Sequence, residues 1–556
     1  MIKQFLTPKL YHQKILFKQI RLKSFITTPI FYVNGNPHIG HIYTTLLADA
    51  SHRWALLKAG NKANPSNFAF VTGVDEHGIK VQSAALAAGL QPQEHVDQNT
   101  AKFRDAFKKF GIKNTDFVRT SEDRHKKAVT HFWNTLNSKG YIKKSNYEGW
   151  YSAIDECFYS EKDVEKLDSS SNKMVTKEAK NPVEWIKEDN YMFDIGEFYE
   201  PLKEWLNSGV ISPDNFLPVA LSALRSDEKL SVSRDSKRVK WGIRVPGDES
   251  QTIYVWLDAL VNYLTAVGYP GTNITNLWPP NVQILGKDIL KFHAIYWPAF
   301  LMAAELPLPQ KLFVHSHWLV DGRKMSKSYG NVLDPNDLSE LLTTEGLRYF
   351  LLRQGTPQDD SNITIPKAID LINSELVNAL GNLLSRCTVE KLNPNQVYPT
   401  FYDEVLKSTL KENGQQLVDG LNSLAENVTK CYDNLYFYRG LELIFEQIRS
   451  TNALLEIHRP WSMKDGPELS TILFISYETI RIANILLQPI VPEYANKSLS
   501  RVGIGDKERS LETAIFGGLQ LDGRKLGKNC GNVMARIVQI KETTPLKKKK
   551  KSAKAA

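Results

Sequence analysis

The feature that most constrains the fold is a strand, a turn, a helix and a second strand that follow one another near the start of the sequence. Residues 25–33 are rich in β-branched and aromatic side chains, which favour a strand, and Asn34–Pro37 is typical of a turn. Apolar residues at helical spacing then indicate one face of a helix that ends at Gly60: Ile42, Leu46, Leu47, Ala50, Trp54 and Leu57. A second strand at residues 68–71 completes a βαβ unit, which predicts a parallel sheet with helices on its faces.

The later sequence continues this sheet after an interruption. Residues 120–230 are polar and are predicted to form an inserted domain. Strand-like and helical patterns then alternate: strands at Thr252–Trp256, Val282–Leu285 and Leu312–Val314, and helices at Asp258–Val267 and Asp288–Ala304. The simplest account is a parallel sheet that is interrupted by an insertion and then completed.

Beyond about Ile365 the periodicity is helical throughout, for example at Ile369–Arg386 and Leu441–Ile457. This predicts a C-terminal helix bundle. A chain of 556 residues is too long for one compact core, so three or four domains are expected. The predicted fold class is therefore α/β, with an insertion in the sheet domain, followed by an all-α bundle.

The formal net charge of +9 is concentrated at the two ends of the chain. Residues 1–24 contain six basic side chains and no acid, and residues 544–556 contain six lysines and no acid. Removing these twelve charges leaves −3 for residues 25–543, so the main body is slightly acidic. The acid-free, amphipathic start is typical of a mitochondrial transit peptide; the alternative is an unstructured basic arm. The lysine run at 547–551 is either a solvated tail or a site of non-specific phosphate attraction.

The four cysteines are far apart in the sequence, and none forms a C-x-x-C pair: Cys157, Cys387, Cys431 and Cys530. This argues against a cysteine-based zinc knuckle and against a disulfide framework, and is typical of a reducing compartment. No uninterrupted apolar run reaches the roughly 18–20 residues of a membrane helix. The best candidate, Ile472–Val491, contains Glu478 and Arg481.

The first candidate site is the tetrad His38-Ile39-Gly40-His41, which lies where the first helix should begin. Backbone N–H groups and the helix dipole attract phosphate at such a position, and two imidazoles can donate to phosphate oxygens. Gly40 allows a ligand to approach the backbone closely. Taken alone the tetrad is a weak signal, because the histidines can simply cap the helix or be solvated.

The second candidate site is the pentad Lys324-Met325-Ser326-Lys327-Ser328, which lies between a strand and helical sequence from Asn336. Glycines flank it on both sides, at Gly322 and Gly330. A lone pentad of this kind is usually a surface turn. A mobile loop with two ammonium groups suits a reaction in which charge develops on pyrophosphate.

The two loops together, in this order and 286 residues apart, resemble the His-Ile-Gly-His and Lys-Met-Ser-Lys-Ser signatures of class I aminoacyl-tRNA synthetases. Surrounding segments narrow the resemblance to the methionyl-tRNA synthetases, in their mitochondrial form, over roughly residues 25–520. These segments are Thr28–Tyr32, Gly73–Gly78, Val255–Leu260, Gly286–Ile289 with His293, and Pro460-Trp461. The resemblance implies a Rossmann-type catalytic domain with a connective insertion and an anticodon-binding helix bundle.

The resemblance also implies a reaction in two steps. The methionine carboxylate attacks the α-phosphorus of ATP, and the aminoacyl group then passes to the 3′ end of tRNA(Met). Mg²⁺ accompanies ATP as a partner of its phosphates. The implied catalytic residues are His38, His41, Lys324 and Lys327. The implied ATP-binding residues are His38, Gly40, His41, Gly286, Asp288, Lys324, Ser326, Lys327 and Ser328, with Asp288 on the ribose.

Methionine recognition, carried over from the family, involves Ile30, Tyr32, Asp75, Trp256, Ala259, Tyr263 and His293. A thioether favours aromatic edges, Asp75 would pair with the substrate ammonium, and Tyr32 and His293 would lie near sulfur. The alternative for Trp256 and Tyr263 is ordinary core packing. Anticodon recognition maps to Asn382, Arg386 and Trp461, where an aromatic ring can stack on a base while amide and guanidinium groups read its edge. The alternative is a helix-packing Trp461 and a surface Arg386.

The sequence departs from many family members in the insertion. Residues 120–230 contain only Cys157, so no zinc is expected. No further tRNA-binding or dimerisation module fits after Gln520, which favours a monomer. The expected divisions are a transit peptide at 1–23, catalytic halves at 24–119 and 231–320, the insertion at 120–230, the second signature with a stem-contact region at 321–368, the bundle at 369–525 and a basic tail at 526–556.

Three competing interpretations fit the sequence less well. Synthetases for isoleucine, valine or leucine need a larger editing insertion than residues 120–230 provide, and a cysteinyl-tRNA synthetase needs cysteine ligands for zinc. An inactive paralogue that only binds tRNA is opposed by the intact His38, His41, Lys324 and Lys327. The expected location is the mitochondrial matrix.

Overall fold

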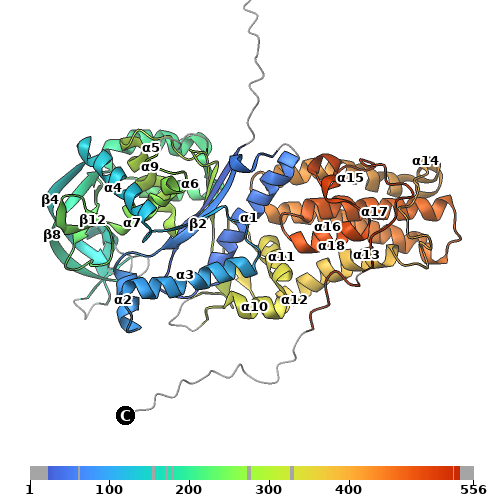
Figure 1. The fold of residues 1–556 in the computed structure, drawn as a ribbon, viewed down its shortest axis with the longest axis horizontal. Helices are drawn as coiled ribbons and strands as arrows, with labels where there is room; N and C mark the ends of the chain where they lie inside the picture. Colours follow the sequence, from blue (N-terminus) through green and yellow to red (C-terminus); the bar gives the residue numbers. More distant parts are fainter. Residues whose placement is uncertain are drawn as a thin grey trace, which may run out of the picture.

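The computed structural model describes residues 23–60, 63–152, 157–159, 161–168, 173–177, 180–271, 277–325, 331–529 and 531–538. Residues 1–22 of the predicted transit peptide and the lysine run lie outside the described residues. The molecule is elongated, with a sheet-containing part at one end and a helical bundle at the other (Figure 1).

A six-stranded sheet forms the centre of the first part, in the order β3-β2-β1-β14-β15-β9, and every neighbouring pair is parallel. Its strands are β1 (Ser24–Tyr32), β2 (Phe68–Asp75), β3 (Asp116–Arg119), β9 (Ile211–Ser212), β14 (Val282–Gly286) and β15 (Leu312–His315). The predicted parallel sheet is therefore confirmed. Helices α1 (Ile39–Ala59), α3 (Pro92–Lys109), α4 (Asp123–Ser138) and α9 (Trp297–Ala303) share buried apolar clusters with its strands, and α2 (Ile79–Ala87) packs against α3.

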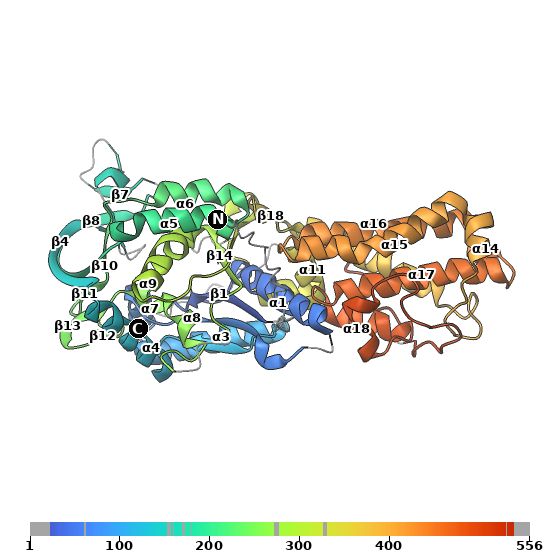
Figure 2. The same ribbon diagram turned by 90° about the horizontal axis from the view of Figure 1, so that it is seen from above.

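Helix α1 begins and ends where the sequence predicted, with His38 as its N-cap and Gly60 as its C-cap. The sequence indicated one apolar face, but the structure buries the other faces as well, including Thr44, Asp49 and His52. The reason is its position: α1 lies against the sheet on one side and reaches the helical bundle at its far end (Figure 2).

Strand β9 is a difference from the predicted organisation, because it lies inside the segment interpreted as an insertion yet extends the parallel sheet beside β15. Its neighbours are α5 (Tyr199–Trp205) and α6 (Leu217–Ala223). Two residues are too few to show any periodicity, so no pattern in the sequence indicates this strand.

The strand predicted at Thr252–Trp256 is wrong in its place and partners. Strand β13 (Asp248–Ile253) belongs to a small antiparallel sheet with β11 (Ser233–Asp235) and β12 (Arg244–Val245), and Trp256 already lies in α7 (Val255–Leu260). A short apolar run does not distinguish a parallel core strand from the end of a hairpin that leads into a helix. Helix α8 (Asn262–Thr265) follows, and the predicted helix at 288–304 is present as η7 (Lys287–Ile289), η8 (Phe292–Tyr296) and α9.

The insertion is built on one long antiparallel pair, β4 (Ile142–Ser152) with β8 (Pro182–Asp194), at the far end of the molecule (Figure 1). Shorter strands extend it: β5 (Cys157–Tyr159), β6 (Val164–Lys166), β7 (Met174–Thr176) and β10 (Lys229–Ser231). One face carries a ladder of complementary cross-strand pairs. In order these are Lys144 over the Tyr191 ring, Asn146 donating to Asp189, Glu148 with Lys187, and Trp150 against Trp185.

A second small sheet lies between the parallel sheet and the bundle, formed by β16 (Trp318–Val320), β17 (Arg323–Lys324) and β18 (Ser361–Ile363). Helices α10 (Pro335–Leu342) and α11 (Thr344–Gln354) follow the second signature. Ser326, Lys327 and Ser328 lie outside the described residues, and so does the side chain of Lys324.

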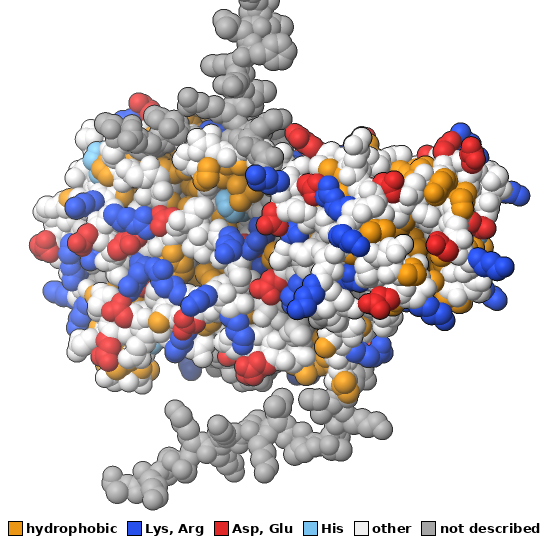
Figure 3. Space-filling view, turned by 45° about the vertical axis from the view of Figure 1, so that its right-hand side comes forward, with side chains coloured by type: hydrophobic (Ala, Val, Ile, Leu, Met, Phe, Trp, Pro, Cys, Tyr) orange, Lys and Arg blue, Asp and Glu red, His pale blue; other side chains and the backbone are white. Residues whose placement is uncertain are grey.

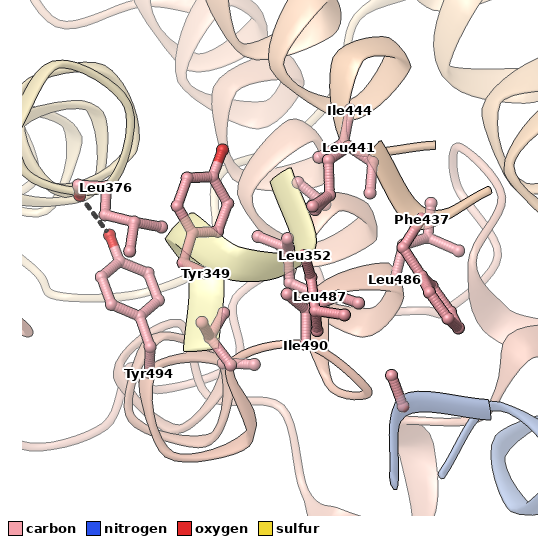
Figure 4. Close-up of a cluster of buried hydrophobic side chains, with 14 of the residues drawn as sticks. Tyr349, Leu352, Leu376, Phe437, Leu441, Ile444, Leu486, Leu487, Ile490 and Tyr494 are labelled. Atoms are coloured by element: carbon pink, nitrogen blue, oxygen red, sulfur yellow. Dashed lines mark hydrogen bonds between the residues drawn. The ribbon is translucent and has the colours of Figure 1, made fainter. Parts of the chain in front are cut away.

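The C-terminal part is helical, as predicted. Its main helices are α12 (Ile365–Ile372), η9 (Asn373–Gly381), α13 (Asn382–Cys387), α15 (Lys411–Tyr432), α16 (Phe437–His458), α17 (Pro467–Leu487) and α18 (Pro492–Arg501). Shorter turns are α14 (Asp403–Val405), η10 (Leu406–Leu410) and η11 (Pro460–Ser462). Side chains from η9, α16, α17 and α18 meet side chains of α11 in one apolar cluster, where the Tyr494 hydroxyl donates to the Leu376 carbonyl at 2.7 Å (Figure 4).

Within the described residues, one helix, α17, is long and apolar enough to cross a membrane, but 94% of its most apolar window is buried inside the protein. Glu478 and Arg481, which interrupt its apolar sequence, form a buried ion pair at 2.7 Å. Arg481 also donates to the carbonyl of Ile515, and Glu478 accepts from the N–H of Gly517. These two charges therefore fasten a C-terminal loop to the centre of the bundle.

Basic and acidic side chains are interspersed over the face seen in Figure 3, on both parts of the molecule. This mixture agrees with the small net charge of residues 25–543.

Candidate functional site

The two histidines of the first signature form a reciprocal cap at the start of α1. The Gly40 N–H donates to Nδ1 of His38, and the His38 N–H donates to Nδ1 of His41, both at 3.1 Å. The two rings stack with centroids 3.7 Å apart. Because Nδ1 is the acceptor in each ring, a neutral imidazole carries its proton on Nε2. The histidines therefore cap the helix, and the proton of each neutral ring lies on Nε2.

The cap needs a residue without a Cβ at position 40, just as the close approach of a ligand would. A Cβ at this position would lie 2.9 Å from Cε1 of the His38 ring. The next turn of α1 is linked to the sheet. The Thr44 hydroxyl donates to the Gly40 carbonyl and lies 2.8 Å from Nε2 of His315, at the end of β15. Burial lowers the pKa of His315 to about 4, so its ring is neutral near pH 7. The sequence interpretation assigned no role to His315. Its position at the end of a strand, here β15, is the signal that could have indicated one.

The proposed ribose site lies at the carboxyl end of β14, where Gly286 pairs in register with His315 of β15. Asp288 follows this glycine, and its Oδ1 lies 3.1 Å from Nε2 of His317. A Cβ on Gly286 would come within 2.6 Å of the Asp288 carboxylate. The aspartate therefore folds back over a glycine at the strand end, the edge at which nucleotides bind to parallel sheets.

The residues predicted to bind methionine come from four places in the chain, and the structure brings them to the same end of the sheet. Tyr32 and Asp75 are register partners at the ends of β1 and β2, and Ile30 pairs with Gly73. A Cβ on Gly73 would lie 2.1 Å from the Val118 carbonyl oxygen of β3 and 2.9 Å from the Ile30 side chain, so only a glycine leaves room for both. Asp75 is buried, and it accepts from the N–H of His77 at 3.3 Å.

The other predicted methionine-binding residues lie on α7, α8 and η8. The Trp256 ring stacks on Phe292 with centroids 3.6 Å apart, and Ala259 is buried on the same helix as Trp256. The Tyr263 hydroxyl donates to Nε2 of His293 at 2.7 Å, because Nδ1 of His293 donates to the Ile289 carbonyl. Burial lowers the pKa of His293 to about 4, and burial raises that of Tyr263. Both groups are therefore uncharged at pH 7, as suits contact with a thioether.

Comparison with known proteins settles the family. The protein-family model described as "tRNA synthetases class I (M)" matches residues 24–388. Mitochondrial methionine–tRNA ligase of Homo sapiens is 45% identical over 543 residues, covering 93% of this chain and 91% of the human protein. The Takifugu rubripes form is 46% identical over 533 residues, 92% of this chain and 89% of its own. The chain belongs to the methionyl class I tRNA synthetases.

Solved structures agree with this family. Mycobacterium tuberculosis methionyl-tRNA synthetase in complex with methionyl-adenylate is similar with a TM-score of 0.84 and 31% identity, covering 92% of this chain and 99% of that chain. The apo form of the same protein has a TM-score of 0.78. The predicted family and fold class are thus confirmed: a parallel catalytic sheet, antiparallel insert sheets and a C-terminal helical region.

The predicted anticodon residues of this synthetase lie together at one end of the bundle. The Arg386 guanidinium lies 4.9 Å from the Trp461 ring centre and also pairs with Glu456 at 2.8 Å. Trp461 is 40% exposed, and Asn382 is exposed one helical turn before Arg386 on α13. Core packing therefore does not explain Trp461. The sequence identified all three residues as candidates. Arg386 and Trp461 are 75 positions apart in the chain, and the packing of the bundle brings them together.

The sequence interpretation missed a group of buried polar residues behind the predicted methionine-binding positions of the synthetase. Asp258 accepts from two histidines, His77 and His125, and Glu76 accepts from Arg119 at 2.8 Å. His77 and Asp258 lie within segments that carried the family resemblance, but neither had been given a role. No local signal in the sequence marks His125.

Proposed function

We propose that this synthetase activates L-methionine with ATP and transfers it to tRNA(Met) in the mitochondrial matrix. The observation that carries the proposal is the reciprocal histidine cap of α1. It holds two Nε2–H donors side by side at a helix N-terminus that faces the carboxyl end of the sheet. The relatives at 44–46% identity are mitochondrial forms, and residues 1–23 have the composition of a transit peptide.

In the first step, an oxygen of the methionine carboxylate attacks the α-phosphorus of ATP, and the bond to pyrophosphate breaks. His38 and His41 donate from Nε2 to phosphate oxygens as charge develops on them. Lys324 and Lys327 hold the leaving pyrophosphate, with Ser326 and Ser328 in the same loop, and Asp288 accepts from the ribose hydroxyls. Catalysis of this kind is mainly positioning and charge stabilisation, since the protein forms no covalent intermediate.

Magnesium fits this site as a partner of ATP. Among the residues that the structure describes, no group of three or more His, Cys, Asp or Glu side chains could hold a metal ion. Mg²⁺ would therefore come bound to the phosphates and would neutralise their charge. We also propose that the insertion folds without zinc, since the ladder of side-chain pairs across β4 and β8 supplies stabilisation that relatives with knuckles draw from metal.

Asp75 would bind the methionine ammonium, and the uncharged Tyr263–His293 pair would lie against the thioether, with Trp256 and Ile30 as apolar walls. Asn382, Arg386 and Trp461 would read the anticodon. We also propose that the synthetase is a monomer, as expected from the sequence.

Pyrophosphate exchange tests the activity. Purified protein that lacks residues 1–23 should incorporate labelled pyrophosphate into ATP only when methionine is present. The control adds isoleucine, valine, leucine or cysteine in place of methionine. Absence of exchange with methionine would sink the enzyme proposal and favour an inactive tRNA-binding paralogue, whereas exchange with another amino acid would favour a different class I synthetase.

A further inference from the structure

Three buried side chains from distant parts of the sequence form a continuous hydrogen-bonded network behind the methionine-binding residues. His77 follows β2, Asp258 lies on α7, and His125 lies on α4. Nδ1 of His77 is 2.6 Å from one Asp258 oxygen, and Nε2 of His125 is 2.8 Å from the other. All three residues are at most 3% exposed.

The network continues at both ends. Nδ1 of His125 lies 2.9 Å from the Thr265 hydroxyl on α8, two residues after Tyr263. At the other end, the backbone N–H of His77 donates to the Asp75 carboxylate at 3.3 Å. One chain of contacts therefore joins Asp75 to the helices that carry Trp256, Ala259 and Tyr263.

The residues on either side of His77, Glu76 and Gly78, are held by other partners. Glu76 accepts from Arg119 and from Thr100, and its carbonyl accepts from the Trp241 ring N–H. The N–H of Gly78 donates to the Trp241 carbonyl. The short loop after β2 is thus held at each residue, and the ring of His77 links it to α7.

The charge on Asp258 makes this link strong. Burial raises the pKa of Asp258, but the two imidazoles outweigh burial and lower it to about 2. The carboxylate is therefore ionised at neutral pH, and a hydrogen bond to an ionised group is stronger than one between neutral groups. A buried carboxylate that accepts from two separate elements fixes the distance between them.

We propose that His77, Asp258 and His125 are positioning residues that hold the Asp75 carboxylate at the distance from α7 and α8 that methionine requires. The inference rests on the proposed binding of the substrate ammonium by Asp75. None of the three residues needs to touch the substrate. Their effect would appear in recognition of the ammonium group, and much less in recognition of the thioether or in the chemical step.

The two histidines offer matched conservative variants, because they bond Asp258 through different ring nitrogens. The amide of asparagine can replace Nδ1, and the amide of glutamine can replace Nε2. His77→Asn and His125→Gln should therefore keep the hydrogen bond, whereas His77→Gln and His125→Asn should lose it. His131→Asn is the control, since His131 lies on the same helix as His125 and bonds Tyr269 outside the network.

The readout is binding of two probes that differ only in the amine, methioninol and 4-(methylthio)butan-1-ol, with a melting temperature recorded for each variant. We expect His77→Gln and His125→Asn to weaken methioninol binding about tenfold, as for a lost hydrogen bond to a charged group, and to leave the amine-free alcohol within about twofold. Methionine KM in pyrophosphate exchange should rise by a similar factor, with kcat changed less.

Equal loss of binding for both probes would overturn the proposal and indicate a general packing defect. Equal behaviour of the asparagine and glutamine variants at one histidine would overturn it in the same way. Should a histidine variant unfold, Thr265→Val removes the last hydroxyl of the network at constant shape, and it should shift methioninol binding in the same direction. Asp75→Asn separates this inference from the proposed function. If wild type does not prefer methioninol, or if Asp75→Asn keeps the preference, the role of Asp75 fails whatever the histidine variants do.

Discussion

At the residue scale, the histidines of the first signature have a structural role and a chemical role on different ring nitrogens. Nδ1 of His38 caps α1, whereas Nε2 is the donor that the proposed reaction uses. Asparagine is a favoured N-cap residue and can accept the same N–H, but it has no group in the place of Nε2. The two roles can therefore be separated by substitution.

His38→Asn and His38→Ala should both slow methionine-dependent pyrophosphate exchange by about 10²–10³-fold, the usual loss for one donor to a developing charge. Only His38→Ala should also lower stability, by about 1 kcal/mol for the lost cap. Urea denaturation followed by circular dichroism checks the second effect. Comparable stability loss in both variants would show that asparagine does not restore the cap.

Two buried histidines should make stability depend on pH. His293 and His315 both have a pKa lowered to about 4 by burial, against an ordinary value near 6.5. The folded protein thus binds fewer protons than the unfolded chain between these values. Their contribution is fully present above about pH 6.5 and is lost as pH falls towards 4, by up to about 1.4 kcal/mol per pH unit for each histidine. The melting temperature of wild type should drop between pH 7 and pH 5, and His293→Gln should reduce that drop. An identical drop in the variant would contradict the role of His293.

At the scale of elements, α13 and η11 form the candidate anticodon interface by presenting Arg386 and Trp461 to solvent while their helices pack inward. Base stacking on an aromatic side chain is worth about 1–3 kcal/mol. Glu456 neutralises Arg386 in the free protein, so binding of RNA has to displace or share this ion pair.

Trp461→Ala should raise the tRNA KM for aminoacylation by about 10–100-fold, and should leave pyrophosphate exchange and the melting temperature unchanged, because the ring is exposed. Glu456→Gln is the companion variant; it frees Arg386 and should not weaken tRNA binding. Parallel losses of exchange and aminoacylation in Trp461→Ala would instead indicate that the ring supports the bundle.

At the scale of the whole molecule, one buried guanidinium joins the catalytic sheet to the bundle. Arg348 on α11 donates to Asp49 of α1 at 2.7 Å, to the Phe110 carbonyl at 2.9 Å, and to the Ile490 carbonyl at 2.9 Å. Farther along α1, Trp54 donates to Asp433 at the end of α15. Helix α1 thus begins at the proposed phosphate site and ends against the bundle (Figure 2).

Arg348→Met should destabilise the protein by about 3–5 kcal/mol, because it leaves the Asp49 carboxylate buried with fewer partners. Adding Asp49→Asn should restore part of that loss, since the uncompensated charge is removed. Thermal unfolding of the two single variants and the double variant measures the coupling. Strictly additive effects would show that the two residues do not act as a pair.

The sequence by itself determined the features that depend on short stretches of chain. The βαβ opening, the start and end of α1, the helical C-terminal part and both signature loops follow from local periodicity, caps and motifs. The family follows from the two signatures and their neighbouring segments. The residues predicted to bind methionine and the anticodon were also named this way, and their roles remain predictions.

Only the tertiary structure decided which distant residues meet. Strand β9 is two residues long, and β13 pairs in an antiparallel sheet that no local pattern distinguishes from a parallel one. The contacts of Asp258 with His77 and His125 span 181 and 133 positions. Contacts of this kind depend on how the elements pack around a shared core, and a single sequence records that packing only as apolar residues of about the right size. The sequence therefore supplied the residues that we predict to face the substrates, and the fold added the residues that we propose to hold them in place.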